Sequence, residues 1–240
     1  MLTVNPFMSR RIFDVIFAAT ALLVFSPILL LSAVGVRVCS PGPIIYRAKR
    51  AGRGGRTFVM YKIRTMHAAP QQGSVITGHG DVRVYPLGKL LRATKIDELP
   101  QLWNVLRGEM SIVGPRPEDP SIVEQHYDAL GMQSLEVKPG LASAGSVYGT
   151  THMHLMGTDV DPETAYLRDL LPVKLAMEVV SIRKQSLIGD LRIIVRTILT
   201  IAQIAAGRRS FDDPPELPEA ERLLREHQHS RASTDIRSAA

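Results

Sequence analysis

Cysteine is almost absent from this sequence, which contains only Cys39. A single cysteine cannot form a disulfide within the chain, and it excludes a zinc site built from several thiolates. A reducing, cytosolic environment is therefore expected. The sequence also lacks an internal repeat and any recognisable nucleic-acid-binding motif, so nucleic acid is the least favoured partner.

Acidic residues are fewer than basic ones. The 240 residues include 23 Asp and Glu against 29 Lys and Arg, which gives a formal net charge of +6, and the sequence pI is about 9.7. A basic chain favours anionic partners such as phosphate ligands or an acidic lipid surface. Hydrophobic residues make up 45% of the chain and charged residues 22%, which is typical of a globular domain and argues against disorder throughout.

Charged residues are also rare between Ile12 and Val38, where the chain is almost entirely apolar. As a helix this segment would reach about 40 Å, which exceeds the roughly 30 Å hydrocarbon core of a bilayer. It is too long for a signal peptide and has no small-residue cleavage site. Hydropathy alone leaves a single membrane-spanning helix as an equal alternative.

Three features of this segment favour a re-entrant, monotopic membrane anchor over residues 1–40. Pro27 must kink the helix, and the Ser26 hydroxyl can satisfy a backbone group that the kink frees. Asp14 lies just inside the leading edge and is expected at headgroup depth. A spanning helix carries its basic excess mainly on one side, whereas here both ends have it: Arg10, Arg11, Arg37, Arg47, Lys49 and Arg50.

The remaining chain is expected to form an α+β catalytic domain over residues 41–207, with short strands and amphipathic interfacial helices around a compact cytosolic body. The pattern predicts strands at 44–46 and 57–61, a polar loop at 67–80, a turn and strand at 138–149, and helices at 120–133 and 163–184. An amphipathic helix ends at Gly207, and its apolar face suits either the core or a membrane surface. Residues 208–240 are expected to be a flexible polar tail, disordered or loosely helical.

The segment KIDELPQLW, residues 95–103, places Asp97 and Glu98 side by side before a Leu-Pro step. Pro100 suits the first turn of a helix, and Gly108 is a suitable stop. The acids are therefore expected at or just before a helix N-terminus, which favours carboxylates and phosphates alike. Helix capping is an equal alternative from this segment alone, but it explains one acid better than two.

Basic residues surround this acid pair in the sequence. Arg92 and Lys95 precede it, Arg116 lies between two prolines, and Lys62 and Arg64 lie in the segment YKIRTM. Neighbouring carboxylates among fixed cations indicate a site that binds Mg²⁺ together with substrate phosphate. A carboxylate can also act as a nucleophile at phosphorus.

These residues resemble the bacterial sugar transferases, specifically the small monotopic polyprenyl-phosphate glycosyl-1-phosphate transferases, also called phosphoglycosyl transferases. The resemblance covers roughly residues 10–200. It rests on RRIFDVIFA…SP, GPIIYRAKRAGRGGRTFVMYKIRTM, DVRVYPLGKLLRATKIDELPQLWNVLRGEMSIVGPRPE, KPGLASAGSVYG and SLIGDLRIIVRTI.

The resemblance implies a reaction and assigns roles to several residues. Asp97 would attack the sugar-bearing phosphate of a nucleotide diphosphate sugar, usually a UDP-sugar, and release UMP. A polyprenyl phosphate, typically undecaprenyl phosphate, would then attack the phosphosugar-aspartate. Glu98 is expected to hold Mg²⁺, and Arg92 and Arg116 to contact phosphate groups. This is the first membrane step of polysaccharide or glycoconjugate synthesis, at the cytoplasmic face of the bacterial inner membrane.

The sequence departs from the family pattern at three places. A small hydroxyl residue is usual where Lys95 stands. The family usually reads Asn-Gly-Arg-Asn where this chain has Tyr-Gly-Thr-Thr at 148–151, so contacts carried by that arginine have no counterpart. Glu178 takes a place that is usually Asp. His152 and His154, two apart, are a weak candidate metal pair, and a solvated loop is the favoured interpretation.

Two alternative functions stay open at this point. The chemistry can proceed by direct displacement, with both acids serving only as metal ligands. The chain can also be a membrane-bound scaffold of a polysaccharide-assembly complex, although intact Asp97, Glu98, Arg92 and Arg116 count against that. The sequence identifies neither the sugar nor the pathway, and it leaves the oligomeric state open, a homo-oligomer included.

Overall fold

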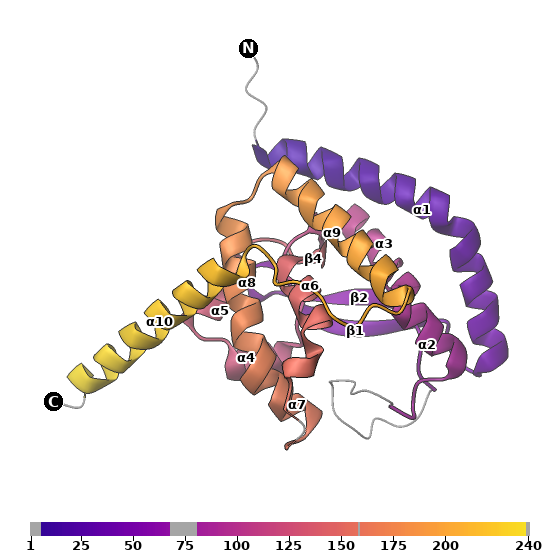
Figure 1. Cartoon of the computed structure of the whole chain (residues 1–240). Helices are drawn as coiled ribbons and strands as arrows, with labels where there is room; N and C mark the ends of the chain where they lie inside the picture. Colours follow the sequence, from indigo (N-terminus) through magenta and orange to yellow (C-terminus); the bar gives the residue numbers. More distant parts are fainter. Residues whose placement is uncertain (1–5, 68–80, 158, 239–240) are drawn as a thin grey trace, which may run out of the picture.

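A computed structural model describes the backbone of residues 6–67, 81–157 and 159–238, and the side chains of residues 8–230 within those ranges. The chain is a mixture of many helices and a few short strands (Figure 1), which confirms the predicted α+β class. The polar loop predicted at 67–80 lies outside the described residues except for His67.

The apolar N-terminal segment forms one helix, α1 (Pro6–Cys39), which bends around one side of the molecule (Figure 1). By length and composition, Met8–Cys39 could cross a membrane. Pro27 lies inside α1 and has no N–H to donate to the carbonyl of Leu23. The Ser26 hydroxyl donates to that carbonyl instead, over 2.8 Å, so the backbone acceptor at the bend is satisfied.

Both ends of α1 pack on the same globular body, and its middle does not. Ala18 near one end and Val36 near the other are fully buried. Between them, Leu23 and Leu31 are 76% and 72% exposed. An exposed apolar middle with two docked ends is the pattern expected of a helix that dips into a membrane and returns.

Asp14 lies in a different environment from the headgroup depth expected from the sequence. Its side chain is buried and accepts hydrogen bonds from the Ser111 hydroxyl over 2.9 Å and from the Ile112 N–H over 2.9 Å. Both donors belong to a short strand, β3 (Ser111–Val113). The carboxylate therefore fixes α1 to the body, a long-range contact that a local hydropathy pattern does not contain.

Two small sheets organise the body. Strands β1 (Ile45–Ala51) and β2 (Thr57–Ile63) pair antiparallel with Ile45 opposite Ile63. The turn between them, η1 (Arg53–Gly55), uses positive φ angles of 66° and 74° at Gly54 and Gly55. Both strands are longer than predicted. Strand β3 pairs in parallel with β4 (Gly140–Ala142).

The helices are short except for α1, α8, α9 and α10. In chain order the helical segments are α2 (Pro86–Ala93), η2 (Ile96–Glu98), α3 (Gln101–Arg107), α4 (Pro120–His126), α5 (Ala129–Gln133), η3 (Ser134–Glu136), α6 (Ala144–Thr151), η4 (Met153–Leu155), α7 (Pro162–Ala165), η5 (Tyr166–Leu170), α8 (Leu171–Arg183), α9 (Leu187–Ala205) and α10 (Leu217–Ser238).

Three predictions about these segments need correction. The helix expected at 120–133 is two helices, because the chain becomes extended at Tyr127 and Asp128 caps a new helix. The strand expected within 138–149 covers only β4. The Ser143 side chain then accepts from the N–H of Ser146 over 2.9 Å and starts α6.

The third correction concerns the C-terminal segment, which is not a flexible tail throughout. Leu217 and Ala220 are buried and lie one helical turn apart. They pack, with Leu224, on the apolar cluster around Met177 and Val180 of α8. This apolar spacing turns residues 217–238 into α10, which extends away from the body (Figure 1).

The core has two main parts, and the acid pair lies beside the first. That part joins α1, the β1–β2 hairpin, α3, β3 and α9 through residues such as Ala18, Met60, Leu102, Ile112 and Ile193. The second joins α5, α6, α8 and α10.

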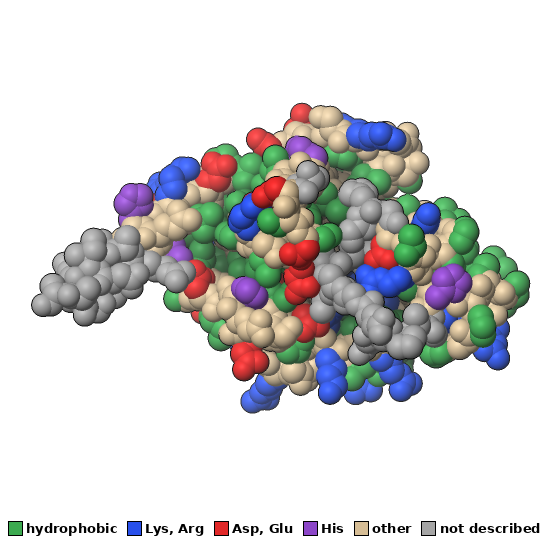
Figure 2. All heavy atoms as spheres, turned by 90° about the horizontal axis from the view of Figure 1, so that it is seen from below, with side chains coloured by type: hydrophobic (Ala, Val, Ile, Leu, Met, Phe, Trp, Pro, Cys, Tyr) green, Lys and Arg blue, Asp and Glu red, His purple; other side chains and the backbone are tan. Residues whose placement is uncertain are grey.

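Viewed from below, basic side chains gather along one edge of the molecule (Figure 2), in keeping with the positive net charge.

Candidate active site

The acid pair occupies a short turn between two helices. Helix α2 ends at Ala93, and Lys95 then adopts a left-handed conformation with a φ of 57°. This residue turns the chain into η2, which carries Asp97 and Glu98. Helix α3 begins four residues after Asp97, so the acids lie just before its N-terminus, in agreement with the sequence.

Glu98 is buried at 7% exposure and lies among cations. Its Oε1 accepts from Lys62 Nζ over 3.1 Å and from Arg116 Nη2 over 3.0 Å. Arg116 Nη1 lies 3.4 Å from Oε2, and Lys95 Nζ is 3.8 Å from Oε1. Burial acts to raise the pKa of Glu98, but Arg116, Lys62 and Lys95 hold it well below its ordinary value.

Asp97 is as buried as Glu98, also at 7% exposure, but its surroundings differ. Its Oδ1 is inaccessible to solvent and has no hydrogen-bond partner among the described residues. Burial and the neighbouring Glu98 raise the pKa of Asp97 to about 6, against the influence of Lys62, Lys95 and Arg92. No described side chain therefore engages this oxygen, which distinguishes Asp97 from Glu98.

The backbone around Arg116 explains how this side chain reaches Glu98. Arg116 follows β3 and lies between Pro115 and Pro117, which restrict its neighbours. Gly140 leaves no room for a Cβ against Gly114, and its N–H donates to the Pro115 carbonyl over 2.8 Å. The β3–β4 pair thus holds the loop that presents the guanidinium.

A second buried polar group lies next to this loop, and of its members sequence reasoning named only Glu178, as a departure from the family pattern. Glu118 accepts from Tyr166 Oη over 2.6 Å and from Lys174 Nζ, and Lys174 is buried. Glu178, also buried, accepts from the Arg116 N–H over 3.4 Å. Burial raises the pKa of Glu178 to about 7. A spacing of four on α8 was the available signal, because it puts Lys174 and Glu178 on one helix face.

The structure brings most, but not all, of the predicted cations to the acids. Lys62 and Arg116 contact Glu98 directly. Arg92 acts on the pKa of Asp97, and its guanidinium has no hydrogen bond or ion pair to the described residues. Arg64 instead donates to the Pro43 carbonyl over 2.6 Å and to Ser40. Arg64 therefore holds the chain leaving α1 and is not part of the acid-pair site.

The two histidines do not form a metal site. His152 is buried, stacks on the Tyr148 ring at 4.4 Å, and its Nε2 lies 3.1 Å from Asp213 Oδ1. This corrects the expected solvated loop at His152. Within the ranges that the structure describes, no cluster of three or more His, Cys, Asp and Glu side chains could hold a metal ion.

Comparison with known proteins gives a consistent result. The sequence model described as "Bacterial sugar transferase" matches residues 5–204. The UDP-glucose:undecaprenyl-phosphate glucose-1-phosphate transferase of Caulobacter vibrioides is 39% identical over 193 residues, which cover 79% of this chain and 68% of the relative. ExoY, an exopolysaccharide production protein of Rhizobium meliloti, is 33% identical over 210 residues, which cover 80% of this chain and 84% of the relative.

A third relative transfers a different sugar according to its name. The UDP-N-acetylgalactosamine-undecaprenyl-phosphate N-acetylgalactosaminephosphotransferase of Aeromonas hydrophila is 35% identical over 195 residues. The match covers 80% of this chain but 43% of that relative, so the chain spans less than half of its length.

Proposed function

Because the chain belongs to the bacterial sugar transferase family, we propose that it transfers a sugar-1-phosphate from a UDP-sugar to a polyprenyl phosphate. The names of the Caulobacter and Aeromonas relatives support undecaprenyl phosphate as the acceptor. Those names differ in the sugar, so the donor's sugar is left open. The Rhizobium relative supports a place in polysaccharide synthesis.

The observation that carries the mechanism is the unpartnered Oδ1 of buried Asp97. In the first step the Asp97 carboxylate attacks the phosphorus that bears the sugar. The bond from that phosphorus to the bridging oxygen breaks, and UMP leaves with the bonding electron pair. In the second step a phosphate oxygen of the polyprenyl phosphate attacks the same phosphorus. The bond to Asp97 breaks, the carboxylate is restored, and the product is a sugar polyprenyl diphosphate.

The cations around Glu98 support this chemistry. Phosphoryl transfer depends mainly on positioning and on neutralising charge on the transferred group. Lys62 and Arg116 are fixed by their contacts with Glu98. Arg92 has no partner within the described part of the chain, and it is therefore available to contact a donor or acceptor phosphate.

The chemistry of the donor set fits Mg²⁺. This ion is usually held by one or two carboxylates together with phosphate oxygens of the substrate. Oε2 of Glu98 accepts only the long contact of 3.4 Å from Arg116 among the described residues, so Glu98 would hold the ion. When bound, Mg²⁺ would neutralise charge on the donor diphosphate. Chelation should therefore stop UMP release; full activity of the chelator-treated protein would contradict the assignment.

The contacts of α1 support a re-entrant anchor, and the resemblance to the sugar transferases supports a body on the cytoplasmic face of the bacterial inner membrane. Arg10 pairs with Asp190 over 2.8 Å at one end of the helix, and Ser40 bonds Arg64 at the other. A helix that crossed the bilayer would place these two ends on opposite sides and break one set of contacts. A re-entrant helix keeps both, and it holds the acid pair where a soluble donor and a lipid acceptor can each arrive.

UMP release tests the proposal most simply. The assay presents a panel of UDP-sugars with undecaprenyl phosphate and Mg²⁺ in detergent, and it compares the wild type with Asp97→Asn. Release with one donor, dependent on the acceptor and lost in the variant, is expected. If folded protein releases no UMP with any donor of the panel, the result would point first to a donor that is not a UDP-sugar and second to the scaffold alternative.

A further inference from the structure

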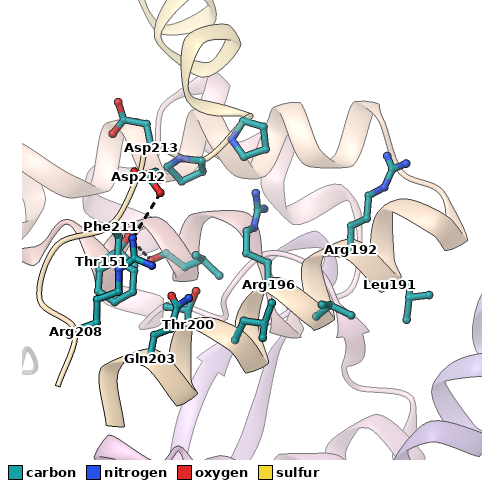
Figure 3. Close-up of a pocket in the computed structure, with 15 residues that line it drawn as sticks. Thr151, Leu191, Arg192, Arg196, Thr200, Gln203, Arg208, Phe211, Asp212 and Asp213 are labelled. Atoms are coloured by element: carbon teal, nitrogen blue, oxygen red, sulfur yellow. Dashed lines mark hydrogen bonds and ion pairs between the residues drawn. The ribbon is translucent and has the colours of Figure 1, made fainter. Parts of the chain in front are cut away.

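A groove of about 550 Å³ runs along α9, away from the acid pair (Figure 3). Its walls come from α9, from α6 and from residues 208–215, which return from α9 towards α10 (Figure 1). The surface exposed in the groove is mainly apolar, and six of its fifteen lining residues are aliphatic or proline: Val147, Leu191, Val195, Leu199, Pro214 and Pro215. None of the residues around Asp97 lines it.

Helix α9 gives the groove a linear shape. Leu191, Val195 and Leu199 recur every four residues and therefore line up along one face. With a rise of 1.5 Å per residue, they span about 12 Å of the helix. A row of aliphatic side chains suits a linear hydrocarbon chain.

The segment 208–215 is held in place by contacts at its far end. Asp213 lies 3.1 Å from Nε2 of buried His152. One residue beyond the groove lining, Glu216 accepts two hydrogen bonds from Arg196, over 2.7 and 2.8 Å. These contacts fix the groove wall formed by residues 208–215 to the folded body.

The charges at the groove leave one cation unpaired. Of the two acids that line it, Asp213 faces His152, and Asp212 lies 3.6 Å from Arg208. Arg192 also lines the groove, and its guanidinium has no hydrogen bond or ion pair to the part of the chain that the structure describes. This cation lies near the start of α9, away from the end of α9 that is beside α2.

We propose that this groove binds the isoprenoid chain of the polyprenyl phosphate acceptor. The inference rests on the proposed function. The groove opens on the exposed face of α9, which also carries Ile188 and Ile198, and the start of α9 is fixed to α1 by Arg10 and Asp190. The C-terminal end of α9 lies beside α2, which carries Arg92 (Figure 1), so the phosphate end of the chain points towards the acid pair.

Two neighbouring residues of α9 provide a matched test. Leu199 lines the groove at 54% exposure, whereas Ile198 is 57% exposed and lies outside it. Leu199→Trp should raise the KM for undecaprenyl phosphate roughly tenfold, the loss expected when about two methylene groups are excluded from a buried site. Ile198→Trp adds the same ring to the same helix and should leave that KM nearly unchanged. Equal effects of the two substitutions would overturn the proposal in favour of a general effect on membrane contact.

Two further readouts separate this proposal from the proposed function. Formation of the donor adduct without acceptor should be the same in the wild type and in Leu199→Trp; loss of the adduct in both would instead refute the proposed function. A photoactivatable farnesyl phosphate in detergent should label peptides from 187–215, and Leu199→Trp should reduce that label while Ile198→Trp does not. Labelling confined to α1, or labelling that undecaprenyl phosphate does not displace, would overturn the groove assignment.

Discussion

Asp97 and Glu98 are consecutive and equally buried, yet their carboxylates have opposite surroundings. Glu98 accepts hydrogen bonds from Lys62 and Arg116, whereas Oδ1 of Asp97 has no partner among the described residues. The pKa of Glu98 is therefore held well below its ordinary value, while that of Asp97 is raised to about 6. Titratable neighbours whose pKa values are driven apart are suited to different roles. In the proposed mechanism, Glu98 stays an anion that organises the cations and would hold the metal, and Asp97 is the reactive group.

The pH dependence of the first step follows from the pKa of Asp97. Only the ionised carboxylate can attack phosphorus, so the rate of UMP release at low donor concentration should rise as pH increases through about 6 and then level off. Initial rates between pH 5 and 8.5 measure this directly. A rate that is constant from pH 5 to 7 would contradict a nucleophile with this pKa.

Asp97→Asn should abolish turnover and stabilise the fold at neutral pH. Burial raises the pKa of Asp97 from 3.8 to about 6. Between these two pH values the folded state keeps a proton that the unfolded state has lost. Raising the pH therefore lowers the free energy of unfolding of the wild type. This loss of stability is complete above about pH 6. A shift of this size corresponds to at most about 3 kcal/mol. Thermal unfolding of both proteins at pH 5 and pH 8 should show the larger gain at pH 8; an equal gain at both would be inconsistent with this carboxylate as the cause.

Arg116 and Glu98 should be energetically coupled. Arg116→Ala leaves buried Glu98 with fewer cations and should lower the free energy of unfolding by about 1–3 kcal/mol, since Arg116 is partly exposed. Adding Glu98→Gln removes the poorly compensated charge, so the double variant should lose less than the sum of the single variants. Unfolding of all four proteins in one detergent completes the cycle. If the losses in free energy of unfolding were strictly additive, the contact between Arg116 and Glu98 would contribute little to stability. In either case, none of the three variants should release UMP.

The bend of α1 should depend on Pro27. Pro27→Ala restores an N–H that can donate to the Leu23 carbonyl, which favours a straight helix and a spanning topology. Single cysteines at Met8 and Pro41, in a Cys39→Ser background, report which side of the membrane each end occupies. Both are expected to be labelled from the cytoplasmic side in the parent protein, and on opposite sides after Pro27→Ala. Unchanged labelling would show that the docked ends, and not the proline, set the topology.

The sequence predicted the local parts of this molecule well and the long-range parts poorly. The acid pair, its place before α3 and the proline in α1 are readable because each depends on a few consecutive residues. Their partners come from elsewhere: Lys62 from β2 and Arg116 from the loop after β3. Basic residues near the motif indicated both, but the same reasoning included Arg64, which bonds Ser40 and Pro43 instead.

Contacts between distant segments explain the remaining differences. The bond of Asp14 to β3 spans about a hundred residues, and the group formed by Glu118, Tyr166 and Lys174 joins three segments. Periodicity reports which face of a segment is apolar, but it does not report which segment covers it. For the same reason the docking of α10 was not predicted, because its apolar residues acquire a role only against α8.

The covalent adduct on Asp97 tests the central claim most directly. The protein is mixed with its UDP-sugar and Mg²⁺ without acceptor, and intact mass and peptide mapping follow. The mechanism predicts the added mass of one sugar phosphate on the peptide that contains Asp97, its absence in Asp97→Asn, and its discharge by undecaprenyl phosphate. Full turnover with no adduct, or an adduct on another residue, would contradict the mechanism, and the first of these results would favour direct displacement.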